Sequence, residues 1–189
     1  DDEPARCDAN GIILLVERIA PKTPLVPGDP EVRARMFGLV HELAGEMGFG
    51  WCRRLMMLHS SAQLPPEQTA PMREILDRLN ARYGYSPENA RKAPERVSQI
   101  LRMLTACLQA QAERGSRFFV GDQLTALDVY WAAFAALLEP LPEEVCAMPA
   151  GLRAQYHVRD AKVRVDGDPI LLHHRDYIYE TALELPLDL

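Results

Sequence analysis

The sequence predicts an all-α fold, a helical bundle, and three observations support this prediction. Most of the chain repeats apolar residues at helical spacing, and almost no segment shows the alternation of a strand. Prolines and capping residues stand at the expected ends of the repeating segments. With 189 residues, of which 48% are hydrophobic and 25% charged, the chain has the composition of a globular protein with one main core.

The N-terminal segment, residues 1–20, is predicted to carry one helix over about residues 8–20. Its apolar positions form one stripe: Ile12, Leu15, Val16 and Ile19. The next ten residues, 21–30, contain four prolines: Pro21, Pro24, Pro27 and Pro30. Because proline lacks an amide donor and restricts φ, this stretch is predicted to be a semi-rigid linker. The helical domain then occupies residues 31–189.

The helical domain is predicted to open with a long helix that has Asp29 as its N-cap and Pro30 at its first position. A glycine-rich stretch, residues 45–50, then interrupts the apolar spacing, so a kinked helix and two shorter helices both fit. A third helix is expected with Pro71 in its first turn, and a fourth is expected to run to Gly115.

The strongest helix signal is the segment TALD, residues 125–128. The Thr125 hydroxyl can accept from the amide three residues on, while the Asp128 carboxylate reaches back, as in a capping box. The helix that follows has a broad apolar face, so it is expected at the centre of the bundle. Thr125 and Asp128 are accordingly interpreted as residues that stabilise the fold and not as catalysts.

The C-terminal part is predicted to contain two further helices separated by a weaker segment. Pro142 opens a helix that runs toward Tyr156. Residues 157–165 alternate weakly and are expected to be extended. Asp168 then caps a last helix that ends at about Leu183.

The charge and the hydropathy of the chain exclude several classes of partner. Lys and Arg total 21 against 27 Asp and Glu, a net charge of −6, which argues against binding of a nucleic-acid backbone. No apolar run approaches the roughly 20 residues of a membrane span, and the acidic start is the opposite of a signal peptide. We therefore expect a cytoplasmic protein that binds neither nucleic acid nor membrane.

The cysteines and histidines do not predict a metal site or a disulfide framework. The four cysteines form no CxxC pair and are expected to be reduced thiols. His173, His174 and Asp176 lie close in sequence, but adjacent residues on a helix point about 100° apart and cannot easily share one ion. Hydrogen-bonded or solvated histidines are the preferred interpretation, and no metal is expected.

Two parts of the chain resemble the glutathione transferases. The segment DANGII (8–13) and the linker ending in LVPGDP (25–30) resemble the hinge between the two domains of that family. The run FVGDQLTALDVY (119–130) resembles the buried capping motif of the family's helical C-terminal domain. The tail from about residue 157 matches no pattern of the family.

The resemblance implies a thioredoxin-like domain that holds glutathione as co-substrate and a helical domain that forms the pocket for a small apolar electrophile. Residues 1–20 then resemble the last helix of the thioredoxin-like domain, and the catalytic residue, which is unknown, is expected outside this sequence. The resemblance also implies a homodimer. Asp8 matches the family acid that holds the γ-glutamyl group, whereas Ala9 stands where the family has a hydroxyl, so one hydrogen bond to the tripeptide is lost.

The residues that by resemblance border the electrophile pocket lie on the long helix and just beyond its glycine-rich bend: His41, Met47, Trp51 and Arg54. Aromatic and thioether groups suit an apolar substrate. The alternative is that Met47 and Trp51 pack in the core. Arg53 and Arg54 by themselves are too few for an anion site. Cys7 precedes a helix start that favours a thiolate, although an incidental surface cysteine fits equally.

Two functions are compatible with these features. The first is a glutathione transferase-like enzyme in which the helical domain binds the electrophile and a thioredoxin-like part activates the thiol. The second is a non-catalytic helical module for protein association or for binding an apolar ligand, which Ala9 favours.

Overall fold

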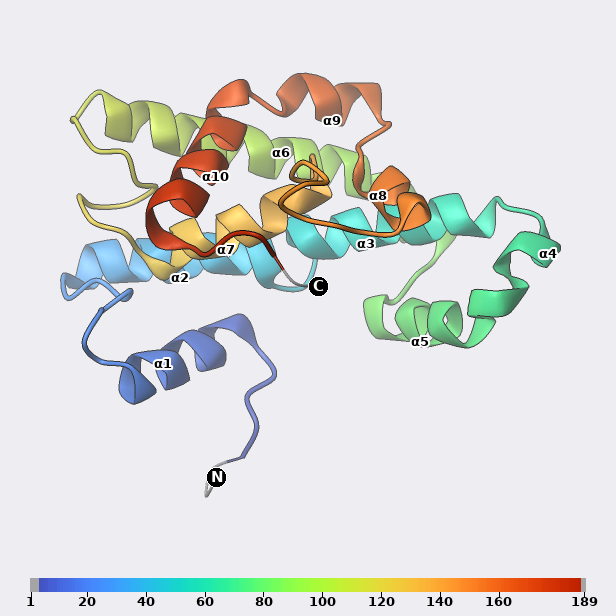
Figure 1. Ribbon diagram of the computed structural model, residues 1–189, viewed down its shortest axis with the longest axis horizontal. Helices are drawn as coiled ribbons and strands as arrows, with labels where there is room; N and C mark the ends of the chain where they lie inside the picture. Colours follow the sequence, from blue (N-terminus) through green and yellow to red (C-terminus); the bar gives the residue numbers. More distant parts are fainter. Residues whose placement is uncertain (1–3, 188–189) are drawn as a thin grey trace.

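The computed structural model describes residues 4–187, and every regular element in that range is a helix (Figure 1). Apart from the helices, this range contains one isolated parallel bridge, between Cys146 and Leu187. The prediction of an all-α fold is therefore confirmed. Among the described residues, no helix has both the length and the apolar character that a membrane span requires.

The body of the molecule consists of α2 (Pro30–Ala44), α3 (Phe49–Ala62), α6 (Pro87–Ala112), α7 (Ala126–Phe134) and α10 (Pro169–Ala182). Helix α7 packs against both α2 and α10, and α3 lies along α6 (Figure 1). The Trp131 side chain of α7 is fully buried, and its indole Nε1 donates to the Leu171 carbonyl oxygen at 2.9 Å. Helix α7 is therefore the central helix, as predicted.

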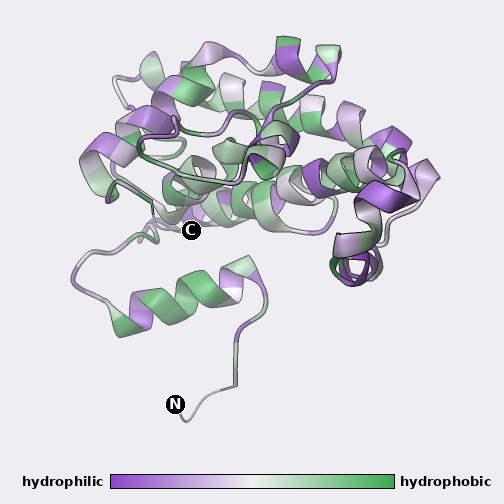
Figure 2. Ribbon diagram, turned by 45° about the vertical axis from the view of Figure 1, so that its right-hand side comes forward, coloured by the Kyte–Doolittle hydropathy of each residue, from purple (hydrophilic) through white to green (hydrophobic). Residues whose placement is uncertain are grey.

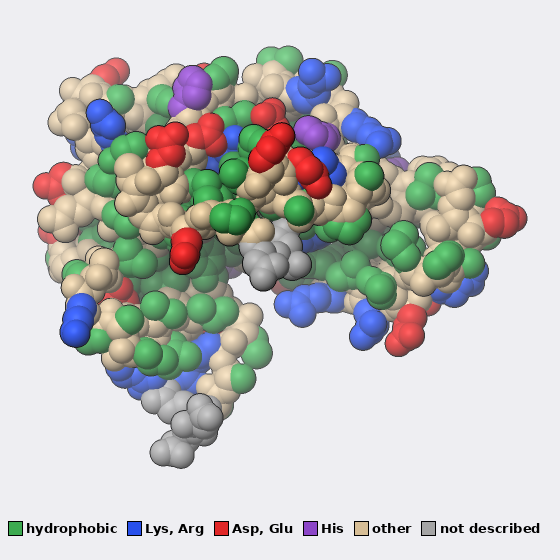
Figure 3. Space-filling view, in the orientation of Figure 1, with side chains coloured by type: hydrophobic (Ala, Val, Ile, Leu, Met, Phe, Trp, Pro, Cys, Tyr) green, Lys and Arg blue, Asp and Glu red, His purple; other side chains and the backbone are tan. Residues whose placement is uncertain are grey.

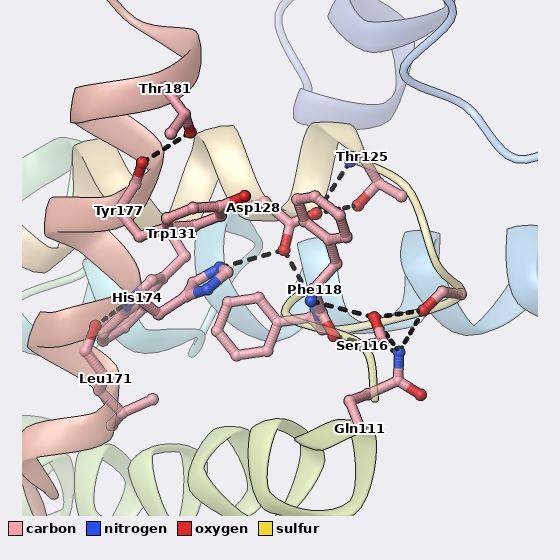
Figure 4. Close-up of polar contacts among 12 residues, drawn as sticks. Gln111, Ser116, Phe118, Thr125, Asp128, Trp131, Leu171, His174, Tyr177 and Thr181 are labelled. Carbon is pink, nitrogen blue, oxygen red and sulfur yellow. Dashed lines mark hydrogen bonds and ion pairs between the residues drawn. The ribbon is translucent and has the colours of Figure 1, made fainter. Parts of the chain in front are cut away.

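The capping box at the start of α7 is present and is completed by a residue far away in sequence. The fully buried Asp128 carboxylate accepts from the Thr125 amide at 2.9 Å and from the Phe119 amide at 3.0 Å (Figure 4). His174 of α10 lies 3.1 Å from the same carboxylate. This network joins α7, α10 and the preceding loop, because a buried carboxylate requires several donors.

The N-terminal helix α1 (Ala9–Ile19) begins at Asp8, whose carboxylate accepts from the Gly11 amide at 2.8 Å. The linker after α1 contains no helix or strand, as its prolines predict. Two hydrogen bonds at Leu25 hold it in place: the Glu17 carboxylate accepts its amide at 2.6 Å, and its carbonyl accepts the Ala126 amide at 2.8 Å. The linker therefore connects α1 to the start of α7.

The glycine-rich stretch separates α2 and α3 into two helices. Gly45 ends α2 and Gly48 precedes α3. A Cβ atom on Gly50 would lie 2.2 Å from Cε1 of Phe134, so the absence of a side chain lets α3 approach α7 closely. Met47 lies in the turn with a φ of 56°, a left-handed conformation that is rare outside glycine.

Helix α5 (Arg73–Tyr83) follows two short turns, α4 (Pro66–Thr69) and the 3₁₀ turn Ala70–Met72. These elements form an arm that projects from the body (Figures 1 and 2), and none of their residues is fully buried. Helix α6 begins with Ser86 as its N-cap, well before the apolar repeat that predicted it. It ends at Ala112, close to the expected stop.

The helix predicted from Pro142 toward Tyr156 is wrong in its first half, because α8 spans only Ala150–Tyr156. Within residues 142–149 the chain turns instead, and Cys146 is buried. The Arg153 guanidinium donates to the Leu141 and Cys146 carbonyls at 2.8 and 2.5 Å. These tertiary contacts satisfy carbonyl groups that a helix would otherwise have paired.

The expectation of an extended segment over residues 157–165 is also wrong, because α9 spans Ala161–Asp166. Asp160 caps this helix by accepting from the Val163 amide at 3.0 Å, and Val163 is fully buried. Arg102 of α6 pairs with Asp166 at 2.7 Å. Packing against α6 therefore stabilises a helix too short to be recognised from its apolar spacing.

Candidate functional site

A cavity of about 580 Å³ lies where the start of α1 meets the helical domain. Its walls come from the N-terminal end of α1, the end of α2, the first half of α3, the ends of α5 and α8, and the end of α7. The volume falls in the range of sites for small organic ligands. The cavity therefore joins residues from both sides of the proline linker.

Four of the five predicted site residues line this cavity: Asp8, His41, Trp51 and Arg54. Met47 is the exception, because the turn between α2 and α3 directs it toward the core. Its carbonyl oxygen accepts from Nε of Arg96 at 3.3 Å. Met47 therefore packs against the core, in line with the alternative interpretation, and does not line the cavity.

Aromatic side chains form one wall of the cavity. Trp51 and Tyr83 meet edge to face, with their ring centroids 5.0 Å apart. Phe134 and Tyr156 also line the cavity. The sequence did not single out Tyr83, Phe134 or Tyr156 as site residues, because each lies at the end of its helix and only the packing of helices brings the three ends together.

Two adjacent arginines of α3 point in different directions. Arg53 is buried, and its guanidinium donates to the carbonyls of Leu137 and Tyr156 at 2.7 and 3.1 Å. Burial, with the neighbouring Arg54 cation, lowers the pKa of Arg53 to about 10. Arg54 instead lines the cavity, where Nη2 donates to the Tyr156 hydroxyl at 3.3 Å and the guanidinium lies over that ring.

The α1 end of the cavity presents hydrogen-bond acceptors. Asp8 lines it with a carboxylate, and Asn10 contributes a buried Oδ1 that has no hydrogen-bond partner within residues 4–187. Tyr130 donates to the Ala9 carbonyl at 3.5 Å. Burial and the nearby Asp8 carboxylate raise the pKa of Tyr130. This end of the cavity therefore suits a ligand that carries N–H donors or a cation.

Cys7 is exposed and lines the cavity, whereas the other three cysteines are buried. Burial raises the pKa of the Cys52 thiol to about 11, and its sulfur contacts the Met47 carbonyl oxygen at 3.4 Å. Cys52 is therefore unreactive, as expected for a core residue. Across the described residues no hydrogen bond joins Cys7 to His41, so the cavity contains no assembled nucleophile and base.

No metal-binding group is present among residues 4–187, where no three His, Cys, Asp or Glu side chains come together. His174, one of the histidines considered as a metal ligand, is hydrogen-bonded to Asp128 in the core (Figure 4).

No protein-family model, curated protein or solved structure matches this chain. The evidence for the function of the cavity is therefore its geometry. An aromatic wall, hydrogen-bond acceptors at one end and arginine side chains are features of a ligand-binding site.

Proposed function

We propose that this chain is the electrophile-binding part of a glutathione transferase-like protein and that the cavity is its second-substrate pocket. One observation carries the proposal: Asp8, at the start of the segment that resembles the family's hinge, lines the same cavity as Trp51 and Arg54 of the helical domain. A transferase needs a co-substrate site and an electrophile site that open into one space, because the thiol must reach the electrophile.

The exposed face of α1 supports a covering domain. Ile12, Val16 and Ile19, which share one face of the helix, are all exposed, and the side of α1 that faces the viewer in Figure 3 is largely hydrophobic. An amphipathic helix normally buries such a stripe. The stripe suits a thioredoxin-like part packed against α1, which would supply the activated thiol.

The reaction in this proposal is a thiol transfer. The glutathione thiolate forms a bond to an electrophilic carbon, and a leaving group departs with its electron pair, or the carbon next to the new bond takes up a proton. The chain's own residues contribute binding and orientation: the Trp51 and Phe134 rings hold the apolar body of the electrophile. Asp8 can accept from the γ-glutamyl ammonium, while Ala9 provides no hydroxyl.

Retention of the complete gene product on a glutathione-affinity column tests this proposal. Elution by free glutathione is the expected result, and Asp8→Asn should weaken retention because the ammonium loses an ionic partner. Clean flow-through of the parent protein would contradict the proposal. The proposal also includes a cytoplasmic location and a homodimer. Light scattering of the purified protein tests the homodimer, because it measures the molar mass in solution.

A second candidate function is a non-catalytic module for protein association or apolar-ligand binding. The exposed apolar face of α1 favours it, because such a face suits a protein partner as well as a covering domain. A conjugation assay with glutathione and an aryl halide separates the two functions. Product formation supports the transferase, whereas ligand binding without product supports the module.

A further inference from the structure

We infer that the ligand of this cavity is an aromatic molecule with an oxyanion group, such as an aryl carboxylate or sulfonate, and that Arg54 binds the oxyanion. The inference deepens the proposed function by naming a substrate class, and it rests on that function because it concerns the same cavity. An apolar pocket alone would not require an anionic ligand, so the charges of the cavity decide the question.

Arg54 is a half-buried cation without a carboxylate partner in the described part of the chain. Its contacts are neutral: the Tyr156 hydroxyl at 3.3 Å, the Tyr156 ring with its centroid 5.5 Å away, and the Met57 sulfur at 4.0 Å. By contrast, Arg96 and Arg102 of α6 each pair with a carboxylate, at 2.5 and 2.7 Å. A partly desolvated guanidinium without a counter-ion favours an anionic ligand.

Two further arginines raise the positive potential at this end of the cavity. Arg53 lies beside Arg54 and donates to two backbone carbonyls and to the Met56 sulfur, and the two cations repel each other. Arg82 of α5 lines the same cavity, and among residues 4–187 it pairs with no carboxylate. A bound anion would reduce the electrostatic repulsion between these arginine side chains.

The acids of the cavity do not neutralise these arginines. Asp8 is the N-cap of α1, where its carboxylate accepts from the Gly11 amide. Glu46 is exposed and forms no ion pair with Arg54 or Arg82 within the described residues. The cavity is therefore bipolar, with acceptors at α1 and guanidinium groups at α3 and α5.

The aromatic part of the ligand follows from the neighbours of Arg54. Tyr156 holds the guanidinium in position through its ring and its hydroxyl, so the donors of Arg54 are oriented before a ligand binds. Trp51 and Tyr83, which pack edge to face on each other, line the same cavity. An oxyanion with at least two oxygens on an aryl ring matches both features, because guanidinium can donate to two oxygens of a carboxylate or sulfonate at once.

The test compares two probes that share an aromatic body and differ in charge: anilinonaphthalene sulfonate and neutral phenylnaphthylamine. Binding is followed by quenching of Trp51, with Trp51→Phe as the control that removes the signal. Protection of Cys7, the exposed thiol of the cavity, from a thiol reagent gives a second readout. Arg54→Gln removes the charge at nearly constant size, and Arg78→Gln is the matched control on α5, because Arg78 does not line the cavity.

The expected result is that Arg54→Gln weakens binding of the sulfonate about tenfold, the loss of one charge-assisted contact, and changes binding of the neutral probe less than about twofold. Arg82→Gln, which changes an exposed side chain and leaves the core intact, should weaken sulfonate binding about threefold. Arg78→Gln should change neither probe. Partial recovery of sulfonate binding in Arg54→Lys would support a charge contact.

Two results would overturn the inference, and they differ from failure of the proposed function. If both probes bind the parent equally, or if Arg54→Gln weakens both probes alike, the anion preference is wrong while the pocket remains. If neither probe quenches Trp51 or protects Cys7, the cavity is not a ligand site and the proposed function fails as well. Thermal unfolding of each variant identifies a variant that has lost its fold. If Arg54→Gln does not fold, the anion preference is tested by comparing the binding of the two probes to Arg82→Gln and to the parent.

Discussion

The two tryptophans differ in ways that make each a probe of one region. Trp51 is half-buried in the cavity wall, next to Tyr83. Trp131 is fully buried between Phe49 and Phe119, with ring centroids 5.6 and 6.3 Å away. A ligand in the cavity therefore contacts one indole and not the other.

We predict that a hydrophobic electrophile analogue quenches Trp51 far more than Trp131. The quench should vanish in Trp51→Phe and persist in Trp131→Phe, because only Trp51 lines the cavity. Fluorescence titration of both variants measures this. Loss of the quench in Trp131→Phe alone would place the ligand elsewhere.

We predict that Cys52 makes the stability of the fold depend on alkaline pH. Burial raises its pKa from 9.0 to about 11, so between these values the folded thiol keeps a proton that the unfolded thiol releases. Ionisation then favours the unfolded chain, and the free energy of unfolding falls as the pH rises through this window. Denaturant titrations of the parent and Cys52→Ala should show a stability difference that shrinks from pH 9 to pH 11. A constant difference would be inconsistent with a protonated buried thiol.

At the scale of single elements, the ends of helices depend on a few polar groups and on one close approach between helices. Asp8, Asp29, Asp160 and Asp168 each cap a helix with a carboxylate, a role that the sequence predicted for Asp29 and Asp168. The cap of α7 differs, because Asp128 is fully buried and also holds His174. Removal of this cap should therefore also weaken the contact between α7 and α10.

We predict that Thr125→Ala lowers the free energy of unfolding by about 1 to 2 kcal/mol, because the helix loses its cap and Asp128 loses a hydroxyl donor at 2.7 Å. Denaturant midpoints of the variant and the parent measure the change. Thr69→Ala is the control: the Thr69 hydroxyl is exposed, and its removal should cost less than about 0.5 kcal/mol. Unchanged midpoints for Thr125→Ala would show that the buried network contributes nothing.

We predict that Gly50→Ala destabilises the fold by about 1 to 3 kcal/mol, because its methyl group would overlap the Phe134 ring. The double variant Gly50→Ala with Phe134→Leu should recover part of that loss, because the smaller leucine side chain leaves room for the alanine methyl group. Urea unfolding of the single and double variants measures the coupling. Equal stability of the parent and Gly50→Ala would mean that α3 and α7 separate easily. The same glycine lines the cavity, so its replacement should also weaken ligand binding.

At the scale of the whole molecule, α1 is attached to the helical domain by one face and exposes another. Ile13 is buried against the domain, whereas Val16 and Ile19 are 47% and 72% exposed. The linker and the bond from Tyr130 to Ala9 complete the attachment. The position of α1 matters for function because its first turn forms one end of the cavity.

We predict that substitutions on the two faces of α1 affect different properties, one the stability of the fold and the other association with a covering domain. Ile13→Ala should lower the free energy of unfolding by about 2 kcal/mol, because it removes buried apolar atoms. Val16→Glu should leave this chain within about 0.5 kcal/mol of the parent but prevent a covering domain from packing on α1. Thermal unfolding measures the first effect, and co-purification with the thioredoxin-like part that the proposed function requires measures the second. Val16→Glu that still binds the covering part would contradict the assigned role of this face.

The sequence by itself determined the features that depend on neighbours three or four residues apart. Apolar spacing predicted the main helices, prolines predicted the linker, and Thr125 with Asp128 predicted the cap of α7. It also identified Asp8, His41, Trp51 and Arg54, all of which line one cavity. It failed over residues 142–149 and 161–165, where contacts from Arg153 and packing against α6 decide the structure.

Only the tertiary structure decided which sides of these elements meet. The stripe on α1 is visible in the sequence, but periodicity does not say whether a partner covers it. Arg53 and Arg54 look alike in sequence, yet the turn of about 100° between neighbours on a helix sends one to buried carbonyls and the other to the cavity. Arg82, Phe134 and Tyr156 join that cavity from three other helices. Local patterns determine the elements, whereas a site made from distant segments depends on their packing.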